Sequence, residues 1–215
     1  MAEKISQGEE TLIPKSEWVD KKEIQGTDAM VLQHPMMNRA FEKILDLHKP
    51  KHDIALVSLC TSTRPYSKSI KWKTYKQKYG NYCDCIIASN GGIIPIEFEN
   101  CYPYLTYDAH GQAKYDNLYN SYLLKRFKLF FNKFPYKYIV FNFRHNLRNV
   151  KPALKFKKEY KQGKCFIVPT KKAYELDQKN NFKPYSRYYP DLAYNSQKQM
   201  EKIIFSLAKI VKGDK

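Results

Sequence analysis

Four short runs of apolar and β-branched residues most constrain how this chain folds. They span residues 53–59, 84–88, 138–143 and 165–169, and stretches with helical periodicity separate them. Such runs are typical of parallel strands that are buried on both faces of a sheet. Strands that alternate with helices form βα units. We therefore predict an α/β fold of three layers, with a mainly parallel central sheet of about four strands and helices on both faces.

The predicted helices fill the stretches between and around these strands. Their apolar residues recur every three or four positions and so share one helix face. The helices cover residues 36–48, 70–79, 117–134 and 195–211. Residues 93–108 contain two prolines and are predicted to be a mostly irregular connection. We expect a single domain over residues 29–215, preceded by a tail or an arm over residues 1–28, which lack apolar periodicity.

The charge of the chain favours a polyanionic partner. The 38 basic residues exceed the 21 acidic ones and give a formal net charge of +17. Such a surface attracts nucleic acid because it releases counterions from phosphates, although a lysine-rich composition can also leave a solvated surface without a partner. The apolar content of 43% is too high for a disordered chain.

Other global features indicate a cytoplasmic protein. No apolar stretch reaches the roughly 18 residues of a membrane span, so we expect no membrane partner. The polar N-terminus lacks the apolar core of a signal peptide. Five cysteines, an odd number without framework spacing, suggest reduced thiols.

The loop after the first predicted strand, residues 60–69, carries the most reactive groups. In α/β folds ligands bind beyond the carboxyl ends of the strands, and Cys60 lies at such an end. A helix start near residues 67–69 offers free amides that bind anions and lower the pKa of a nearby thiol. The fork of Arg64 can hold a carboxylate or a phosphate. The alternative is an ordinary Ser/Thr-rich connection with an inert cysteine.

The same loop carries a family signature. Cys60, Pro65, Tyr66 and Ser69 occupy, without a gap, matching positions of the motif Pro-Cys, three residues, Lys-Pro-Tyr, two residues, Ser, two residues, His. This motif is that of the archaeosine synthases, which the chain resembles. Three positions depart from the family pattern: Leu59 replaces the proline, Arg64 the lysine and Trp72 the histidine.

A second block strengthens the resemblance. Residues 92–99 are similar to the family segment Gly-hydrophobic-Val-Pro-Arg-Glu-Leu-Glu, and Tyr102-Pro103 and Tyr107-Asp108 follow in the family order. Ile96 stands where the family has arginine. With His34-Pro35 ahead of the domain, the resemblance covers about residues 30–145.

The resemblance implies a reaction and its partners. Archaeosine synthases act on tRNA that carries a cyano-deazaguanine base, and add an amine, lysine in known cases, to the nitrile. Larger members also contain transglycosylase-like and RNA-binding PUA regions, for which this chain is too short. We therefore expect the core domain alone, with tRNA and a small amine or amino-acid donor as partners. A separate transglycosylase-like, PUA-containing or radical-SAM subunit is a further expected partner.

Residue chemistry and the resemblance together suggest roles for the site residues. A thiolate of Cys60 can add to the nitrile carbon to give a thioimide, which the amine then displaces. The other expected roles are carboxylate binding by Arg64, acceptance of a proton from the ammonium or its binding by Glu97 or Asp108, and orientation of base or donor by Tyr66 and Ser69. Trp72 in place of the family histidine removes one acid/base group.

Two further residues follow predicted strands and are candidates for substrate binding. Asn90 opens the turn after the second strand, and His145 follows the third. For His145 the alternative is a structural hydrogen bond. We expect no cofactor, since the sequence Asn90-Gly91-Gly92 has neither the Walker lysine nor dinucleotide spacing.

A metal site is the weaker interpretation of the cysteines. Cys83 and Cys85 lie two residues apart on a predicted strand, and Cys60 and Cys101 lack zinc-site spacing relative to them. We expect buried strand thiols and no metal.

Residues 151–164 form the most basic stretch of the chain. Phe156 and Tyr160 are interleaved with six lysines. The six are Lys151, Lys155, Lys157, Lys158, Lys161 and Lys164. We predict RNA contact, with lysines on phosphates and exposed aromatic rings stacked on bases. The alternative is a helix whose apolar residues face the core and whose lysines are solvated.

Three functions remain open from the sequence. The first is a tRNA-modifying enzyme or subunit of archaeosine synthase type. The second is a catalytically inactive RNA-binding module or accessory subunit with the same fold, which the departures at Leu59, Arg64, Ile96 and Trp72 favour. The third is another nucleic-acid base-modifying or glycosidase-like enzyme.

Overall fold

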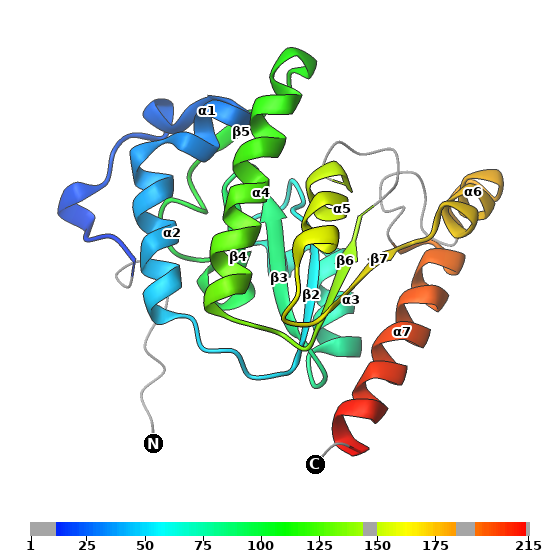
Figure 1. Ribbon diagram of the computed structural model, residues 1–215. Helices are drawn as coiled ribbons and strands as arrows, with labels where there is room; N and C mark the ends of the chain where they lie inside the picture. Colours follow the sequence, from blue (N-terminus) through cyan, green and yellow to red (C-terminus); the bar gives the residue numbers. More distant parts are fainter. Residues whose placement is uncertain (1–11, 144–149, 184–191, 214–215) are drawn as a thin grey trace.

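The centre of the molecule is a five-stranded sheet (Figure 1). The computed structural model describes residues 12–143, 150–183 and 192–213. The strands are β2 (Ile54–Leu59), β3 (Asp84–Ser89), β4 (Gly92–Pro95), β6 (Tyr138–Asn142) and β7 (Lys164–Val168), in the order β4-β3-β2-β6-β7. Four of them are parallel, as predicted, whereas β4 runs antiparallel to β3. The sheet is therefore mixed, and the predicted number of about four strands is too low.

The additional strand β4 results from a tight hairpin. Asn90 and Gly91 form its two-residue loop, since Ser89 pairs with Gly92 across the ladder. An Asn-Gly pair favours such turns. Gly92 has φ +102°, and a Cβ there would lie 3.2 Å from Leu32, so glycine is required. The hairpin returns the chain to the amino ends of the parallel strands, where the sequence predicts only an irregular connection.

Helices cover both faces of this sheet, and the molecule has the three predicted layers (Figure 1). On one face lie α2 (Pro35–Leu47), α4 (Asp116–Lys133) and α5 (Val150–Glu159); on the other lie α3 (Ile70–Tyr79) and α7 (Tyr194–Gly213). Successive side chains of β6 show the two faces. Phe141 contacts Phe127 of α4, with ring centroids 5.2 Å apart, and Asn142 donates a hydrogen bond to Tyr75 of α3.

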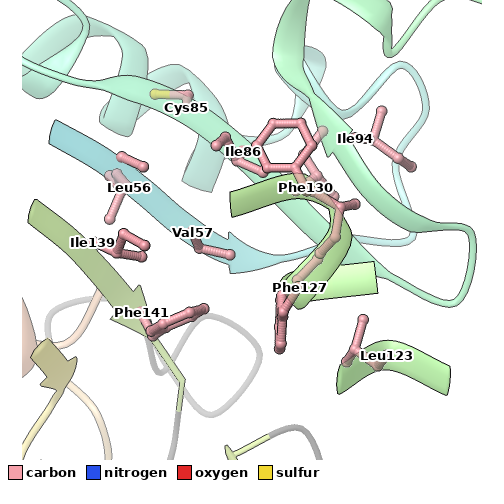
Figure 2. Packing of buried hydrophobic residues seen from close by; sticks show 14 of the residues in the cluster. Leu56, Val57, Cys85, Ile86, Ile94, Leu123, Phe127, Phe130, Ile139 and Phe141 are labelled. Carbon is pink, nitrogen blue, oxygen red and sulfur yellow. The ribbon is translucent and has the colours of Figure 1, made fainter. Parts of the chain in front are cut away.

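An aromatic and aliphatic core lies between α4 and the sheet. Figure 2 shows Phe127 and Phe130 of α4 next to side chains of β2, β3 and β6, including Val57 and Phe141. These side chains are fully buried. Aromatic pairs at this spacing contribute beyond the area they bury, so the α4 face holds the helix layer on the sheet.

The opposite layer is joined by ionic and aromatic contacts. Lys78 of α3 pairs with Glu201 of α7 at 2.6 Å, and the rings of Tyr79 and Phe205 lie 6.1 Å apart. The sequence does not indicate the short helix α6 (Lys171–Lys179). Its Asp177 accepts hydrogen bonds from the backbone N–H groups of Asn195 and Ser196, and so fixes the first turn of α7.

The described part of the N-terminal segment is an arm that packs on the rest of the chain. It contains the 3-10 turns Lys15–Glu17 and Lys21–Ile24, then β1 (Gln25–Thr27) and α1 (Asp28–Gln33). Leu12, Ile13 and Ile24 are buried, and the ring of Trp18 stacks on Tyr102 at 4.6 Å. β1 pairs in parallel with β5 (Asp108–His110) and forms a second, two-stranded sheet. Residues 1–11 lie outside the described residues.

Three further 3-10 turns complete the described elements. They are η3 (Tyr66–Lys68), η4 (Ile96–Phe98) and η5 (Ala113–Tyr115). Among the helices of the described ranges, none combines the length and the hydropathy that a bilayer span requires.

A hydrogen-bonded chain joins the amino ends of the parallel strands. Tyr136 donates from its hydroxyl to Asp84 Oδ2 at 2.9 Å, and the Tyr136 hydroxyl oxygen itself lies 3.0 Å from His48 Nε2. His48 Nδ1 in turn lies 2.7 Å from Glu97 Oε1. Burial, and then the charge of Asp84, raise the pKa of Tyr136, so its hydroxyl keeps its proton and remains a donor.

Replacing Tyr136 by phenylalanine should lower the free energy of unfolding by about 1–3 kcal/mol, because Asp84 and His48 both lose a buried partner. Urea denaturation followed by circular dichroism measures the change. Tyr138→Phe is the matched control, since the Tyr138 hydroxyl has no hydrogen-bond partner within the described ranges. Equal free energies of unfolding for the two variants would show that the hydrogen bonds of Tyr136 add nothing to the stability of the fold.

Candidate functional site

The loop between β2 and α3 brings the motif residues to the carboxyl end of the sheet. Cys60 directly follows β2 and is half-buried, and Tyr66 is fully buried under the loop. Ser69 ends the loop as the N-cap of α3, where its Oγ accepts a hydrogen bond from the backbone N–H of Trp72 at 3.3 Å. Ser69 is therefore a structural cap, and the role predicted for it in orienting substrate is not visible in these contacts.

Opposing effects act on the thiol of Cys60. Burial raises its pKa, whereas the positive charges of Lys71 and Arg64 and the backbone N–H of Asn90 lower it. Lys71 is held in place because its Nζ donates to the carbonyl oxygen of Leu59 at 2.6 Å. A negative charge at the sulfur, or on a group bonded to it, therefore has two cations and an N–H donor close by.

The guanidinium of Arg64 is fixed on the ring of Tyr107. Its central carbon lies 3.9 Å from the Tyr107 ring centroid and 6.0 Å from that of Tyr66, and the group also donates to the Tyr107 carbonyl oxygen. Such a cation–π contact, combined with a hydrogen bond, restricts the side chain. Arg64 is thus pre-oriented beside Cys60.

A chain of buried hydroxyl groups joins three segments beneath this arginine. The Tyr66 and Tyr107 oxygens are 2.8 Å apart, Tyr107 and Ser89 are 2.9 Å apart, and Ser89 accepts from the N–H of Gly91. Burial raises the pKa of both tyrosines, so both remain neutral donors. The β3–β4 turn, the motif loop and the segment before β5 therefore form one rigid site.

The structure brings together four of the predicted site residues and separates others from them. Cys60, Arg64 and Tyr66 lie together, and Asn90 takes part through its backbone N–H. Glu97 lies at the other end of the sheet beside His48, because β4 reverses the chain direction. Asp108 directly follows Tyr107, but it is exposed on β5. His145 lies outside the described residues.

Two residues of the candidate site are not predicted from the sequence. Lys71 lies within α3, and no local pattern indicates that it is 3% exposed with its Nζ on the strand end. Tyr107 belongs to the second family-like block, and that block is the signal that could have drawn attention to it.

A family model described as "Domain of unknown function (DUF5591)" matches residues 37–173, well over half of the chain. The chain belongs to the DUF5591 family. The matched range begins in α2, includes the whole loop between β2 and α3, and ends in α6. It therefore contains every described residue of the site.

A solved structure with the same fold supports the description of the DUF5591 domain. The chain is similar to "Crystal structure of AF0587, a protein of unknown function", with 19% identity and a TM-score of 0.55. The likeness covers 76% of this chain and 48% of the other, so the chain spans about half the length of that protein. At this identity the likeness shows the fold alone. No curated protein matches the sequence significantly.

The basic stretch of the DUF5591 domain differs from the prediction in one respect. Its first nine residues lie in α5, which begins at Val150, and all six of its lysines are exposed. Phe156 and Tyr160, in contrast, are buried, and their rings stack at 5.0 Å. The prediction that these rings are exposed to stack on bases is therefore wrong, because the helical period turns them towards Phe131 and Phe141. The lysines remain candidates for phosphate contact.

The other thiols of the DUF5591 domain are structural. Cys83, Cys85, Cys101 and Cys165 are buried, and all five cysteines are free thiols. Cys83 donates to the carbonyl oxygen of Tyr79 at 3.3 Å. Burial raises the pKa of Cys165 to about 12. The more accessible Cys60 is thus distinct from the remaining four.

Iodoacetamide should modify Cys60 before any other cysteine of the native protein, since the other four are buried and Cys60 is only half-buried. The rate should rise with pH, because burial raises the pKa of the thiol and only the thiolate reacts. Peptide mass mapping against time measures both effects. Arg64→Gln should slow the reaction by removing a charge that favours the thiolate. Uniform labelling of all five thiols would contradict this description of the site.

Proposed function

We propose that the protein is a tRNA-modifying enzyme, or a subunit of one, of archaeosine synthase type. Its substrate is the nitrile of a cyano-deazaguanine base in tRNA, to which it adds an amine such as lysine. The observation that carries the proposal is the position of Cys60 at the carboxyl end of β2, where the positive charges of Arg64 and Lys71 act on its thiol. Residues of the family-like motif supply the thiol, the arginine and Tyr66 at this position.

The proposed reaction is a net addition in two steps. The sulfur of Cys60 bonds to the nitrile carbon, one C–N π bond opens, and the nitrogen takes up the thiol proton to give a thioimide. The amine nitrogen then attacks the same carbon, the C–S bond breaks, and the amine proton returns to the sulfur. The product is an amidine, and the reaction consumes no oxidant or reductant.

The surrounding groups fit the charge changes of these steps. Lys71 and the N–H of Asn90 stabilise the thiolate before attack and after its release. Arg64, fixed on Tyr107, holds the carboxylate of an amino-acid donor. Asp108 is the carboxylate that accepts the ammonium proton. Glu97 lies beside His48 at the amino ends of the parallel strands, at the opposite end of the sheet from Cys60. The exposed lysines of residues 151–164 bind the RNA backbone.

The proposal implies a cytoplasmic protein and further subunits. A tRNA must first receive the cyano-base, so a separate transglycosylase-like, PUA-containing or radical-SAM subunit is the proposed partner.

A second candidate is an accessory RNA-binding subunit without catalysis. Two observations favour it: the pKa of Cys60 is raised overall, and the fully buried Trp72 occupies the position of the family histidine. An accessory subunit should bind tRNA with unchanged affinity after Cys60→Ala. The third candidate, another base-modifying or glycosidase-like enzyme, would release or alter the base without adding an amine.

Incubation of the full chain with tRNA bearing the cyano-base and labelled amino acids tests the proposal. We expect the modified nucleoside to gain the mass of one donor molecule, either with the chain alone or with a companion subunit. Release of the free base would favour the glycosidase-like candidate. No mass change with any amine would reject the enzymatic function.

A further inference from the structure

A second cavity lies away from Cys60, beside the amino end of β3. It has a volume of about 430 Å³, the size range of sites for small molecules. Its walls come from the segment before β2, α3, the start of β3 and the residues around η4. Three carboxylates, those of Asp84, Glu97 and Glu99, line it together with Lys51 and Lys76.

Glu99 is the most unusual of these groups. The residue is only 4% exposed, and its Oε2 accepts a hydrogen bond from the N–H of Ser67 at 2.7 Å. Oε1 has no hydrogen-bond partner among the residues that the structure describes. Glu99 lines the cavity, so this second oxygen is an acceptor available to a ligand there. A carboxylate with an available oxygen favours a ligand that carries a positively charged donor.

The neighbouring carboxylates follow the same pattern. Asp84 Oδ2 accepts from the backbone N–H of Lys51 at 2.9 Å and from Tyr136, and Glu97 Oε1 pairs with His48. The second oxygen of each has no hydrogen-bond partner within the described ranges. Each of the three side chains thus gives one oxygen to the fold and leaves the other as an acceptor.

The hydrogen-bond network also fixes the protonation of the Glu97–His48 pair. Because the Tyr136 hydroxyl donates to Asp84, its oxygen accepts from His48 Nε2–H. His48 Nδ1 then either donates to the Glu97 carboxylate or accepts from its protonated form. In both arrangements one proton lies between Nδ1 and Oε1 in addition to the proton on Nε2, and the pair is neutral overall. Asp84 and Glu99 are therefore the carboxylates whose charge is uncompensated by this network.

The arrangement suits a molecular cation better than a metal ion. Within the described part of the chain, no three His, Cys, Asp or Glu side chains converge closely enough to hold a metal. A primary ammonium group has three N–H donors on a compact charge and can reach acceptors spread around a cavity. Lys51 and Lys76 in the same walls can receive an acidic group on the ligand.

We propose that this cavity binds a small molecule that carries a primary ammonium group, with Glu99 as its main partner. The site is independent of the chemistry proposed at Cys60. On a protein of net charge +17, such a local group of acceptors is a place where a cation is attracted and not repelled.

Titration of the full chain with glycine, ethylammonium, acetate and Mg²⁺ in separate NMR experiments tests the site. The Ser67 amide is the reporter, because its N–H donates to Glu99. We expect saturable shifts with ethylammonium and glycine, and none with acetate. Tighter binding of glycine than of ethylammonium would show that the lysines hold a carboxylate. Saturation by Mg²⁺ alone, or no saturable shift with either amine, would overturn the proposal.

Glu99→Gln is the decisive variant, since its amide oxygen can still accept from Ser67 while the charge is lost. Removing a charge-assisted hydrogen bond should weaken ethylammonium binding by about tenfold or more. Glu175→Gln, the same change on exposed α6, should leave the affinity unchanged. Circular dichroism checks that both variants fold, and Glu97→Gln repeats the test if the first does not. Wild-type affinity in a folded Glu99→Gln protein would contradict the site.

Discussion

Replacing Cys60 by alanine should abolish amine addition to cyano-deazaguanine tRNA and leave the affinity for that RNA unchanged. In the proposed mechanism the sulfur forms the covalent intermediate, so its loss removes the reaction pathway altogether. A nucleophile replaced in this way lowers turnover by at least about 1,000-fold. In the same proposal RNA affinity depends on the exposed lysines and not on the half-buried thiol.

Initial rates from nucleoside mass spectrometry and affinities from fluorescence anisotropy give the two quantities. Cys165→Ala is the matched control, because it removes a buried thiol from β7 and should leave the rate unchanged. Cys60→Ser tests whether a hydroxyl can replace the sulfur, and it should be nearly as inactive as alanine. Wild-type turnover in Cys60→Ala would remove the thiol from the mechanism.

Neutralising the basic stretch should weaken RNA binding and flatten its dependence on salt. The variant changes six exposed lysines to glutamine: Lys151, Lys155, Lys157, Lys158, Lys161 and Lys164. Each lost phosphate contact lowers the slope of log K against log salt by about 0.7–0.9. If all six contact phosphates, the slope falls by up to about 5, and the affinity near 0.15 M salt falls by at least about 100-fold.

A second variant with the same change in charge distinguishes RNA binding by residues 151–164 from a general attraction of RNA by the net positive charge. It replaces six exposed lysines of α6 and α7, namely Lys171, Lys172, Lys198, Lys202, Lys209 and Lys212. We expect a much smaller loss of affinity and slope from this variant. Equal losses from both would show that the net charge attracts RNA and that residues 151–164 form an ordinary solvated helix face.

The sequence predicts the centre of the fold because its strands are apolar on both faces. The runs at residues 53–59 and 138–143 become β2 and β6, and the predicted helix over residues 70–79 matches α3 to the residue. Those patterns depend only on local periodicity. The short edge strand β4 escapes prediction because its four residues end in Pro95, although Asn90-Gly91 signals a hairpin.

That hairpin also explains which part of the site the sequence places correctly. Cys60, Arg64 and Asn90 follow the carboxyl ends of neighbouring parallel strands, so topology alone brings them together. Glu97 follows a strand of opposite direction, and it therefore lies at the amino ends, beside His48. The contacts of Lys71 depend on tertiary packing, which no local pattern encodes.

The covalent bond between Cys60 and the nitrile is the most direct test of the proposed chemistry. The full chain is incubated with tRNA that bears the cyano-base, without any amine, and the protein is then digested and its peptides are weighed. We predict that the peptide containing Cys60 gains the mass of the added nucleotide after nuclease treatment, and that Cys60→Ala shows no adduct. Absence of an adduct on the wild-type peptide, or an equal adduct elsewhere in Cys60→Ala, would contradict the mechanism.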